Sequence, residues 1–196
     1  MYLKVLVACE SSGVVRNAFR NRGHMAYSCD LLPAEDGSLF HLQGDVRDWL
    51  NHGWDLMIAH PPCTHLAVSG ARWFKDKVDE QAKALVFVEE LLDAPIKKIC
   101  LENPVSIISS WVRKPDQIVQ PYNFGHDASK KTCLWLKNLP LLKPTRFVEP
   151  RYVDGKPRWA NQTNSGQNRL GPSPERAADR ARTYQGIADA MAEQWG

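Results

Sequence analysis

The chain has 196 residues, of which 24% are charged and 43% are hydrophobic. These values are ordinary for a soluble globular protein and exclude a fibrous chain or a disordered one. A chain of this length can bury a core without disulfides or bound metal, so we expect a single domain.

Neither a membrane span nor a secretion signal is indicated. No apolar run approaches the ~20 residues that a bilayer requires, and the first residues lead straight into an expected strand. The cysteines are odd in number and lack a CxxC spacing: Cys9, Cys29, Cys63, Cys100 and Cys133. The sequence therefore predicts a cytoplasmic protein with reduced thiols, no disulfide framework and no metal site.

The net charge of +3 is unevenly distributed along the chain. Residues 1–100 hold 11 Lys or Arg against 13 Asp or Glu, which gives −2, whereas residues 101–196 hold 14 against 9, which gives +5. A basic half indicates contact with a polyanion such as a nucleic acid, although a modest excess also occurs on solvated faces.

The first elements follow a strand, helix, strand pattern. Residues 3–8 predict a strand, residues 14–22 an amphipathic helix, and residues 24–29 a second strand. The small residues of the first turn let a cofactor approach the backbone, and an acid after the second strand can accept hydrogen bonds from ribose hydroxyls. The candidate cofactor-binding residues here are Ala8, Cys9, Glu10, Ser11, Ser12, Gly13, Asp30 and Leu31.

The composition of the first turn bears on the kind of cofactor. The turn lacks a GxGxxG pattern, so a phosphate cradle for a dinucleotide is disfavoured. Glu10 would repel a phosphate but is compatible with a ligand that carries an ammonium or sulfonium group. A third strand over residues 41–46 places Asp45 and Val46 where nucleoside-binding sheets often meet adenine; alternatively, Asp45 caps a helix that starts near Arg47.

The fourth expected strand, residues 54–59, runs into His60, Pro61, Pro62 and Cys63. Paired prolines cannot continue a hydrogen-bonded ladder, so the chain turns there. Cys63 then lies on the loop after a strand, where α/β folds usually keep ligands and chemistry. Alternatively, Cys63 merely packs in the core, as most free cysteines do.

The next elements deliver an acid. A loop over residues 67–74 precedes apolar residues at helical spacing, which predict a helix over residues 76–93. Residues 96–101 predict a fifth strand, and Glu102 follows it directly. Glu102 is therefore a candidate catalytic residue beside Cys63.

Two lysines enter the last expected strand of the sheet. Residues 116–120 and 133–136 predict strands, and the glycine-bearing loop between them carries Lys130 and Lys131. Lysines at a loop end are typical of a solvated surface, but the context of Cys63 and Glu102 makes these two candidates for the same site.

The segment over residues 144–174 is rich in Pro, Gly, Asn, Gln and Arg and predicts an extended conformation. Basic residues interleaved with aromatic ones suit a nucleic-acid backbone and unstacked bases. The chain closes with a helical region over residues 174–195 that is interrupted near Gly186. The candidate nucleic-acid contacts are Arg146, Arg151, Lys156, Arg158, Trp159 and Arg169.

Taken in order, these motifs resemble the motif series of the DNA (cytosine-5) methyltransferases, and most of all the short versions carried by phages and prophages. The resemblance covers nearly the whole chain, and Pro-Pro-Cys followed by Glu-Asn is its most specific part. Its segments are Val5 to Gly13, Pro61-Pro62-Cys63, Glu102-Asn103-Pro104, Phe124-Gly125 with the basic residues after it, and Arg169-Leu170 through Gln185-Gly186-Ile187-Ala188.

The resemblance implies a Rossmann-like α/β fold of the S-adenosylmethionine-dependent methyltransferases, with a mostly parallel sheet flanked by helices. It implies one catalytic domain over residues 1–196, in which 145–168 is a reduced target-recognition segment and the 174–195 region completes the cofactor side. The cofactor would be S-adenosylmethionine, bound in addition by His60, Pro61, Gly186 and Ile187. The substrate would be DNA, either a duplex with a flipped cytosine or a single strand, in the host cytoplasm for a phage-encoded enzyme.

The chemistry that the resemblance implies uses three groups. The thiolate of Cys63 attacks carbon 6 of cytosine and gives an enamine that takes a methyl group from a sulfonium. Glu102, with a pKa raised by partial burial, contacts ring nitrogen 3. Lys130 or Lys131 stands where the family has an arginine pair, and would lower the pKa of the thiol and hold the cytosine carbonyl.

Two other interpretations stay open at this stage. A methyltransferase acting on an exocyclic amino group of DNA or RNA also has a Pro-Pro pair, but it needs an Asp or Asn before the prolines and an aromatic residue after them, where this chain has His60 and Cys63. A catalytically silent nucleic-acid-binding protein could keep the same fold.

The chain departs from the family pattern in two places. The first turn retains one glycine of the family's Phe-Ala-Gly-x-Gly motif, and the short recognition segment could read only a few bases.

Overall fold

The computed structural model describes residues 2–69, 76–171 and 176–196. Its main element is a seven-stranded sheet in the order β3-β2-β1-β4-β5-β7-β6. Strands β1 to β5 pair in parallel, whereas β7 runs antiparallel to both of its neighbours. The strands are β1 (Lys4–Ala8), β2 (Met25–Asp30), β3 (His41–Gln43), β4 (Leu56–Ala59), β5 (Lys98–Pro104), β6 (Gln117–Val119) and β7 (Thr132–Lys137).

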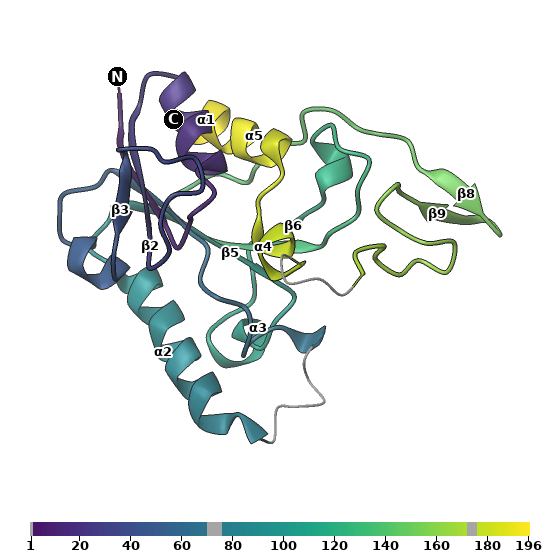
Figure 1. The fold of residues 1–196 in the computed structure, drawn as a ribbon, viewed down its shortest axis with the longest axis horizontal. Coiled ribbons are helices and arrows are strands. Elements are labelled where there is room, and N and C mark those ends of the chain that lie inside the picture. The colour runs from purple at the N-terminus through teal and green to yellow at the C-terminus, as the bar shows by residue number, and fades with distance from the viewer. Residues whose placement is uncertain (1, 70–75, 172–175) are drawn as a thin grey trace.

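Helices cover both faces of this sheet, so the domain has three layers. Helices α1 (Val14–Asn21) and α5 (Gln185–Trp195) lie side by side on one face, and α2 (Val78–Asp93) lies on the opposite face (Figure 1). The shorter helical elements are η1 (Val46–Trp49), α3 (Ile108–Trp111), η3 (Pro121–Asn123) and α4 (Arg176–Ala181). None of the helices in the described ranges has the length and apolarity needed to cross a bilayer.

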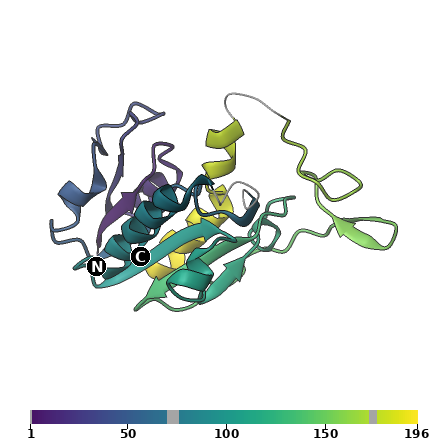
Figure 2. The same cartoon turned by 90° about the horizontal axis from the view of Figure 1, so that it is seen from below.

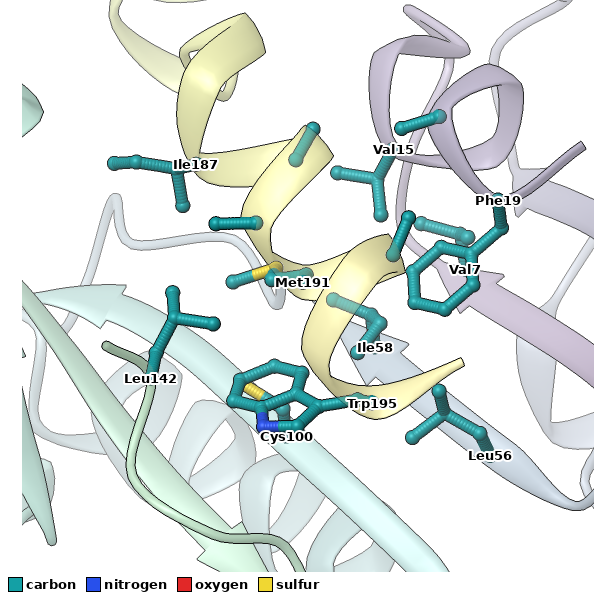
Figure 3. Packing of buried hydrophobic residues seen from close by; sticks show 14 of the residues in the cluster. Val7, Val15, Phe19, Leu56, Ile58, Cys100, Leu142, Ile187, Met191 and Trp195 are labelled. Atoms are coloured by element: carbon teal, nitrogen blue, oxygen red, sulfur yellow. The ribbon is translucent and has the colours of Figure 1, made fainter. Parts of the chain in front are cut away.

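The two layers of the core follow from the alternation of side chains along the central strands. Successive residues of a strand point to opposite faces, and both faces of a parallel sheet are buried. Val5 and Val7 of β1 therefore pack with α1 and α5, whereas Leu6 and Ala8 pack with α2. Figure 3 shows the first of these layers, where Met191 and Trp195 of α5 lie over the sheet.

The predicted fold class is confirmed: the protein is a Rossmann-like α/β domain with a mostly parallel sheet flanked by helices. The expected strands and the helices after the first and fourth strands are present with ends shifted by a few residues. The break in the C-terminal helical region falls at residues 182–184, just before Gly186. Residues 70–74 of the expected loop and Pro174 lie outside the described residues.

The expected extended segment contains a hairpin that periodicity does not predict. Strands β8 (Arg151–Val153) and β9 (Lys156–Arg158) pair antiparallel around Asp154 and Gly155, whose φ angles are 50° and 70°. An Asp-Gly pair favours a two-residue hairpin turn because both positions need positive φ. The hairpin projects away from the sheet in both views (Figures 1 and 2).

Candidate active site

The sheet topology brings most of the candidate site residues to one edge. Because β1 to β5 are parallel, their carboxyl ends share that edge, which ligands favour in open α/β sheets. Strand β7 runs the other way, and its first residue, Thr132, pairs with Pro104 at the end of β5. The loop before β7, which carries Lys130 and Lys131, therefore reaches the same edge of the sheet as the loop that carries Cys63.

Glu10 in the first turn binds the amino end of α1. Its carboxylate accepts hydrogen bonds from the backbone N–H groups of Val15, at 2.7 Å, and Arg16, at 3.2 Å, and the residue is only 6% exposed. The free N–H groups of a helix start are where nucleotide-binding proteins hold a phosphate. In this chain the carboxylate of Glu10 binds the N–H groups that would otherwise bind a phosphate. The turn therefore does not need the glycines that let a phosphate approach the backbone.

The one glycine that the turn retains has a packing role. Gly13 has a φ of 72°, and a Cβ there would collide with the guanidinium of Arg16. Arg16 is fully buried, donates to Ser28 Oγ at 2.8 Å and pairs with Asp36. Sequence reasoning missed this arginine, whose only signal is a charge within the helix that follows the turn.

Glu35 joins the loop after β2 to the first turn by hydrogen bonds. Its backbone N–H donates to the carbonyl of Ser11 at 3.0 Å, and its carboxylate accepts from Ser11 Oγ at 3.2 Å. The same carboxylate pairs with Arg182, in the linker between α4 and α5. Cys9 lies nearby with a φ of 59°, and burial, aided by the charge of Asp30, raises the pKa of its thiol to about 12.

The acids after β2 and β3 both lie at the expected strand ends. Asp30 accepts from the N–H of Leu32 at 2.9 Å, and the neighbouring Leu31 is 72% exposed. Asp45 caps η1 by accepting from the N–H of Arg47 at 2.9 Å, so the capping alternative is observed. Val46, the first residue of η1, is buried.

The loop that carries Cys63 is braced against the end of β5. The side-chain amide of Asn103 donates to the carbonyl of Pro61 at 2.9 Å, and the N–H of Ile107 donates to the carbonyl of Leu66 at 3.0 Å. Leu66 is fully buried, whereas Cys63 remains partly exposed. The two most specific motifs of the sequence therefore hold each other in place and leave the thiol accessible.

His60 forms a buried pair with Glu102. The Nδ1 atom of His60 lies 2.8 Å from Oε2 of Glu102, and their side chains are 10% and 9% exposed. Burial lowers the pKa of His60, but its hydrogen bond to Glu102 and the charges of Glu102 and Glu10 raise the pKa overall. Burial raises the pKa of Glu102, but the hydrogen bond and charge of His60, with that of Lys130, lower it overall.

The expectation that burial raises the pKa of Glu102 is therefore wrong for the free chain, because the hydrogen bond from His60 outweighs burial. The two pKa shifts run in opposite directions, and both favour the charged form of the side chain. Sequence reasoning placed His60 at the cofactor; its position directly after β4, the neighbour of β5, is the signal that pairs it with Glu102.

The surroundings of Cys63 contain opposing charges. Burial and the charge of Glu102 raise the pKa of its thiol, while Arg180 and Lys130 lower it. Lys130 also acts on Glu102 and His60, whereas Lys131 is exposed and acts on Cys133. The structure thus places Lys130, and not Lys131, beside the thiol.

Arg180 is a further cation near Cys63 that sequence reasoning missed. It belongs to α4, and its backbone carbonyl accepts a hydrogen bond from Nζ of Lys130 at 2.7 Å. The ammonium of Lys130 lies 3.5 Å from the carbonyl of Arg182 as well. No motif in the sequence connects this segment with the thiol, because only the fold brings it there.

Several basic residues of the recognition segment bind its own backbone. Arg151 donates to the carbonyl of Gln162 at 2.6 Å, Arg158 to the carbonyl of Asn164 at 3.0 Å, and Arg169 to the carbonyl of Gln162 at 2.8 Å. These arginines therefore order the loop after the hairpin.

The remaining candidates of this segment differ in accessibility. Within the described residues, the side chains of Arg146 and Lys156 make no hydrogen bond or ion pair, and Lys156 is exposed. Trp159 is 9% exposed and stacks on Tyr122, with ring centroids 4.1 Å apart. Tyr152 on β8 is 68% exposed, so it is the accessible aromatic residue of the hairpin.

The last two cofactor candidates lie at the start of α5. Gly186 donates its N–H to Nε2 of His126 at 2.8 Å, and a Cβ at this position would collide with the carbonyl oxygen of Phe124. Ile187 is buried in the core layer beneath α5. Position 186 therefore requires glycine because the start of α5 packs directly against the backbone of Phe124.

No protein-family model matches this sequence, and no curated protein matches it. Among solved structures, one similar chain is described as a "putative DNA modification methyltransferase encoded within prophage" of E. coli. The two chains share 16% identity with a TM-score of 0.49, over 78% of this chain and 53% of the other. This chain thus spans about half the length of that protein.

Proposed function

We propose that the protein is an S-adenosylmethionine-dependent DNA (cytosine-5) methyltransferase that acts through a covalent adduct between Cys63 and its target base. The observation that carries this proposal is that the loop with Cys63, which follows β4, is bound to the end of the adjacent parallel strand β5, which holds Glu102, by the hydrogen bond from Asn103 to Pro61. Addition to a pyrimidine requires a nucleophile and a general acid, and a partly exposed thiol with a buried carboxyl group and two cations can supply them.

The residues of the chain divide the chemistry between them. The thiol of Cys63 loses its proton to solvent, and the sulfur forms a bond to carbon 6. The electron pair of the carbon 5–carbon 6 double bond moves into the carbon 4–carbon 5 bond, and the pair of the carbon 4–nitrogen 3 double bond takes a proton at nitrogen 3 from the Glu102 site. Lys130 and Arg180 supply positive charge that favours the thiolate. S-adenosylmethionine, when bound, supplies the electrophilic methyl group that carbon 5 takes. Loss of the carbon 5 proton to solvent and breakage of the carbon–sulfur bond then restore Cys63.

The first turn fits a nucleoside sulfonium better than a nucleotide. Glu10 fills the helix start that a phosphate would need, and its negative charge is compatible with a nearby sulfonium. Asp30 at the end of β2 would accept the ribose hydroxyls, and Asp45 with Val46 would lie near the adenine. We assign the remaining cofactor contacts to the residues of the first turn and of the β4 end, with Gly186 and Ile187 supporting that side.

DNA is the proposed substrate, and residues 145–168 are the proposed target-recognition segment of a single catalytic domain over residues 1–196. The target cytosine must leave the base stack, or be presented in a single strand, before Cys63 can reach carbon 6. Positive charge on the projecting hairpin supports contact with the phosphate backbone. The 174–195 region would close the cofactor side.

Nucleoside mass spectrometry tests this function. Purified protein is incubated with DNA and S-adenosylmethionine that carries a labelled methyl group, and the DNA is then digested to nucleosides. We expect label in 5-methylcytosine for the wild type and none for Cys63→Ala, which should still bind the cofactor. Label in an exocyclic amino group would instead support the amino-methyltransferase alternative, and DNA binding without any transfer would support a silent binding protein.

A further inference from the structure

His60 occupies an unusual place between the two halves of the proposed site. Its backbone N–H donates to the carbonyl of Ala8 at 2.9 Å, which fixes it beside the first turn, and its Nδ1 atom lies 2.8 Å from Oε2 of Glu102. About nine-tenths of each side chain in this pair is buried. The Nε2 atom of His60 is buried as well and has no hydrogen-bond partner within the described residues.

This arrangement changes where the catalytic proton resides. Addition of a thiolate to cytosine is favoured when ring nitrogen 3 receives a proton, and an ionised carboxylate has none of its own to give. The 2.8 Å contact between Nδ1 of His60 and Oε2 of Glu102 joins this carboxyl group to a buried imidazole that can carry a proton. Among the described residues no hydrogen bond uses Oε1 of Glu102, so one carboxylate oxygen faces His60 and the other is free for a bound base.

We propose that His60 is a positioning residue that supplies Glu102 with the proton delivered to nitrogen 3 of the target cytosine, so that the two side chains act as one acid. This inference rests on the proposed function and deepens it.

The proton transfer is balanced. The proton leaves Nδ1 of His60 for Oε2 of Glu102, which leaves a neutral imidazole and a neutral carboxylic acid. Rotation about the soft Cγ–Cδ bond then presents the O–H to nitrogen 3. As the sulfur of Cys63 bonds to carbon 6, nitrogen 3 takes this proton and Glu102 becomes a carboxylate again. When the carbon–sulfur bond breaks, the proton returns from nitrogen 3 through Glu102 to His60.

The same transfer also changes the charges near the nucleophile. It removes the negative charge of Glu102, which opposes ionisation of Cys63, together with the positive charge of His60, so the net charge of the pair does not change. The charged groups that face His60 are Glu102, Glu10 and Lys130. Those that face Glu102 are His60 and Lys130, with the thiols of Cys63, Cys100 and Cys133 nearby.

The kinetic test compares His60→Gln with the wild type and with His52→Gln, a matched control at an exposed histidine outside the site. Glutamine keeps an N–H donor for Glu102 but does not titrate near neutral pH. We expect the single-turnover rate of His60→Gln, measured at saturating S-adenosylmethionine, to fall roughly a hundredfold near neutral pH and to lose the wild-type decline at alkaline pH. A His60→Gln variant with the wild-type rate and pH profile would overturn the inference.

A second measurement does not depend on turnover. The NMR titration of His60 in the free wild-type protein is expected to lie above the ordinary value of 6.5, and to move down by about one pH unit or more in Glu102→Gln. A His60 titration that is unaffected by Glu102→Gln overturns the pairing. Absence of methyl transfer by the wild type overturns the proposed function and the proton transfer with it, even where this titration confirms the pair.

Discussion

At the scale of single residues, the proposed nucleophile is held in its unreactive form until a substrate arrives. Burial and Glu102 raise the pKa of Cys63, and Arg180 and Lys130 only partly oppose them. A protonated thiol in the free protein is protected from oxidation and from unproductive alkylation, since the thiolate is the reactive species. Reactivity therefore depends on the charge state of its neighbours.

Replacement of these neighbours should change the alkylation of Cys63 in opposite directions. Glu102→Gln removes the anion that raises the pKa of the thiol, so iodoacetamide should label Cys63 several-fold faster at about pH 8. Arg180→Gln removes a cation that lowers the pKa, so labelling should slow. Peptide mass spectrometry measures both rates, and Cys9, with a pKa of about 12, serves as an internal control that stays largely unlabelled. Equal rates in the two variants would contradict this assignment of charges.

At the scale of single residues, a sequence predicts position best near the end of a strand. Cys63 lies on the loop after β4 and Glu102 lies in the last half of β5, so the parallel pairing of these strands brings both to one edge of the sheet. The sequence could not choose between Lys130 and Lys131, because that depends on the path of the loop before β7, which brings Nζ of Lys130 to the carbonyls of Arg180 and Arg182. Arg180 could not be predicted at all, since it approaches Cys63 only through the path of α4 over the sheet.

At the scale of elements, the linker between α4 and α5 joins the two sides of the site. Arg182 pairs with Glu35, which also binds Ser11 of the first turn. On the other side, Lys130 donates to the carbonyls of Arg180 and Arg182. The position of Lys130 is thus coupled to the loop that borders the proposed cofactor pocket.

Loss of the Glu35 carboxylate should loosen this linker without unfolding the domain. Both partners of the pair are partly exposed, so Glu35→Gln should cost less than about 1 kcal/mol of global stability. Hydrogen exchange should nevertheless become faster at residues 180–188. The matched control is Glu193→Gln, which breaks the exposed pair with Arg22 and should leave this exchange unchanged. An identical effect of both variants on the linker would refute the coupling.

The hairpin is the other element with a testable role. Lys156 is exposed and has no described partner, whereas Arg151 orders the loop that follows. Lys156→Gln should therefore weaken DNA binding and lower the slope of log affinity against log salt by about 1, with the fold intact. Arg151→Gln should in addition loosen residues 162–166. A salt slope unaffected by Lys156→Gln would count against the hairpin as the DNA-binding surface.

At the scale of the whole molecule, the two faces of the sheet form the core, and the carboxyl ends of its strands carry the candidate site. The two faces of β1 and its neighbours are filled by α1 and α5 on one side and by α2 on the other, so the site lies at the carboxyl edge. Periodicity predicted this architecture because long apolar runs and amphipathic helices carry strong patterns. The four-residue helix α3 and the three-residue strands of the hairpin are too short for such a pattern, although Asp154-Gly155 marked the turn.

The buried pair of His60 and Glu102 also makes the stability of the fold depend on pH. The raised pKa of His60 contributes stability that is full below its ordinary value of 6.5 and is lost as pH rises through the folded-state value. The lowered pKa of Glu102 contributes stability above its ordinary value of 4.5 that is lost as pH falls through the folded-state value. The pair therefore stabilises the fold most fully between these two ordinary values.

Urea unfolding measures this dependence. Between about pH 6 and pH 9 the wild type should lose more free energy of unfolding than the double variant His60→Gln with Glu102→Gln, by about 1.4 kcal/mol for each pKa unit by which His60 is raised. His52→Gln should follow the wild type. Parallel stability curves for the wild type and the double variant would show that the pair does not titrate as described.

The central claim is that Cys63 forms a covalent bond with a cytosine of DNA, and one measurement tests it most directly. DNA in which every cytosine is replaced by 5-fluorocytosine is incubated with the protein and S-adenosylmethionine, because fluorine at carbon 5 cannot leave as a proton and so blocks release. We expect a denaturation-resistant complex whose peptide map places the nucleotide on Cys63, and none with Cys63→Ala. A wild-type protein that transfers methyl groups to ordinary DNA yet gives no such complex, or gives one at another residue, would contradict the account.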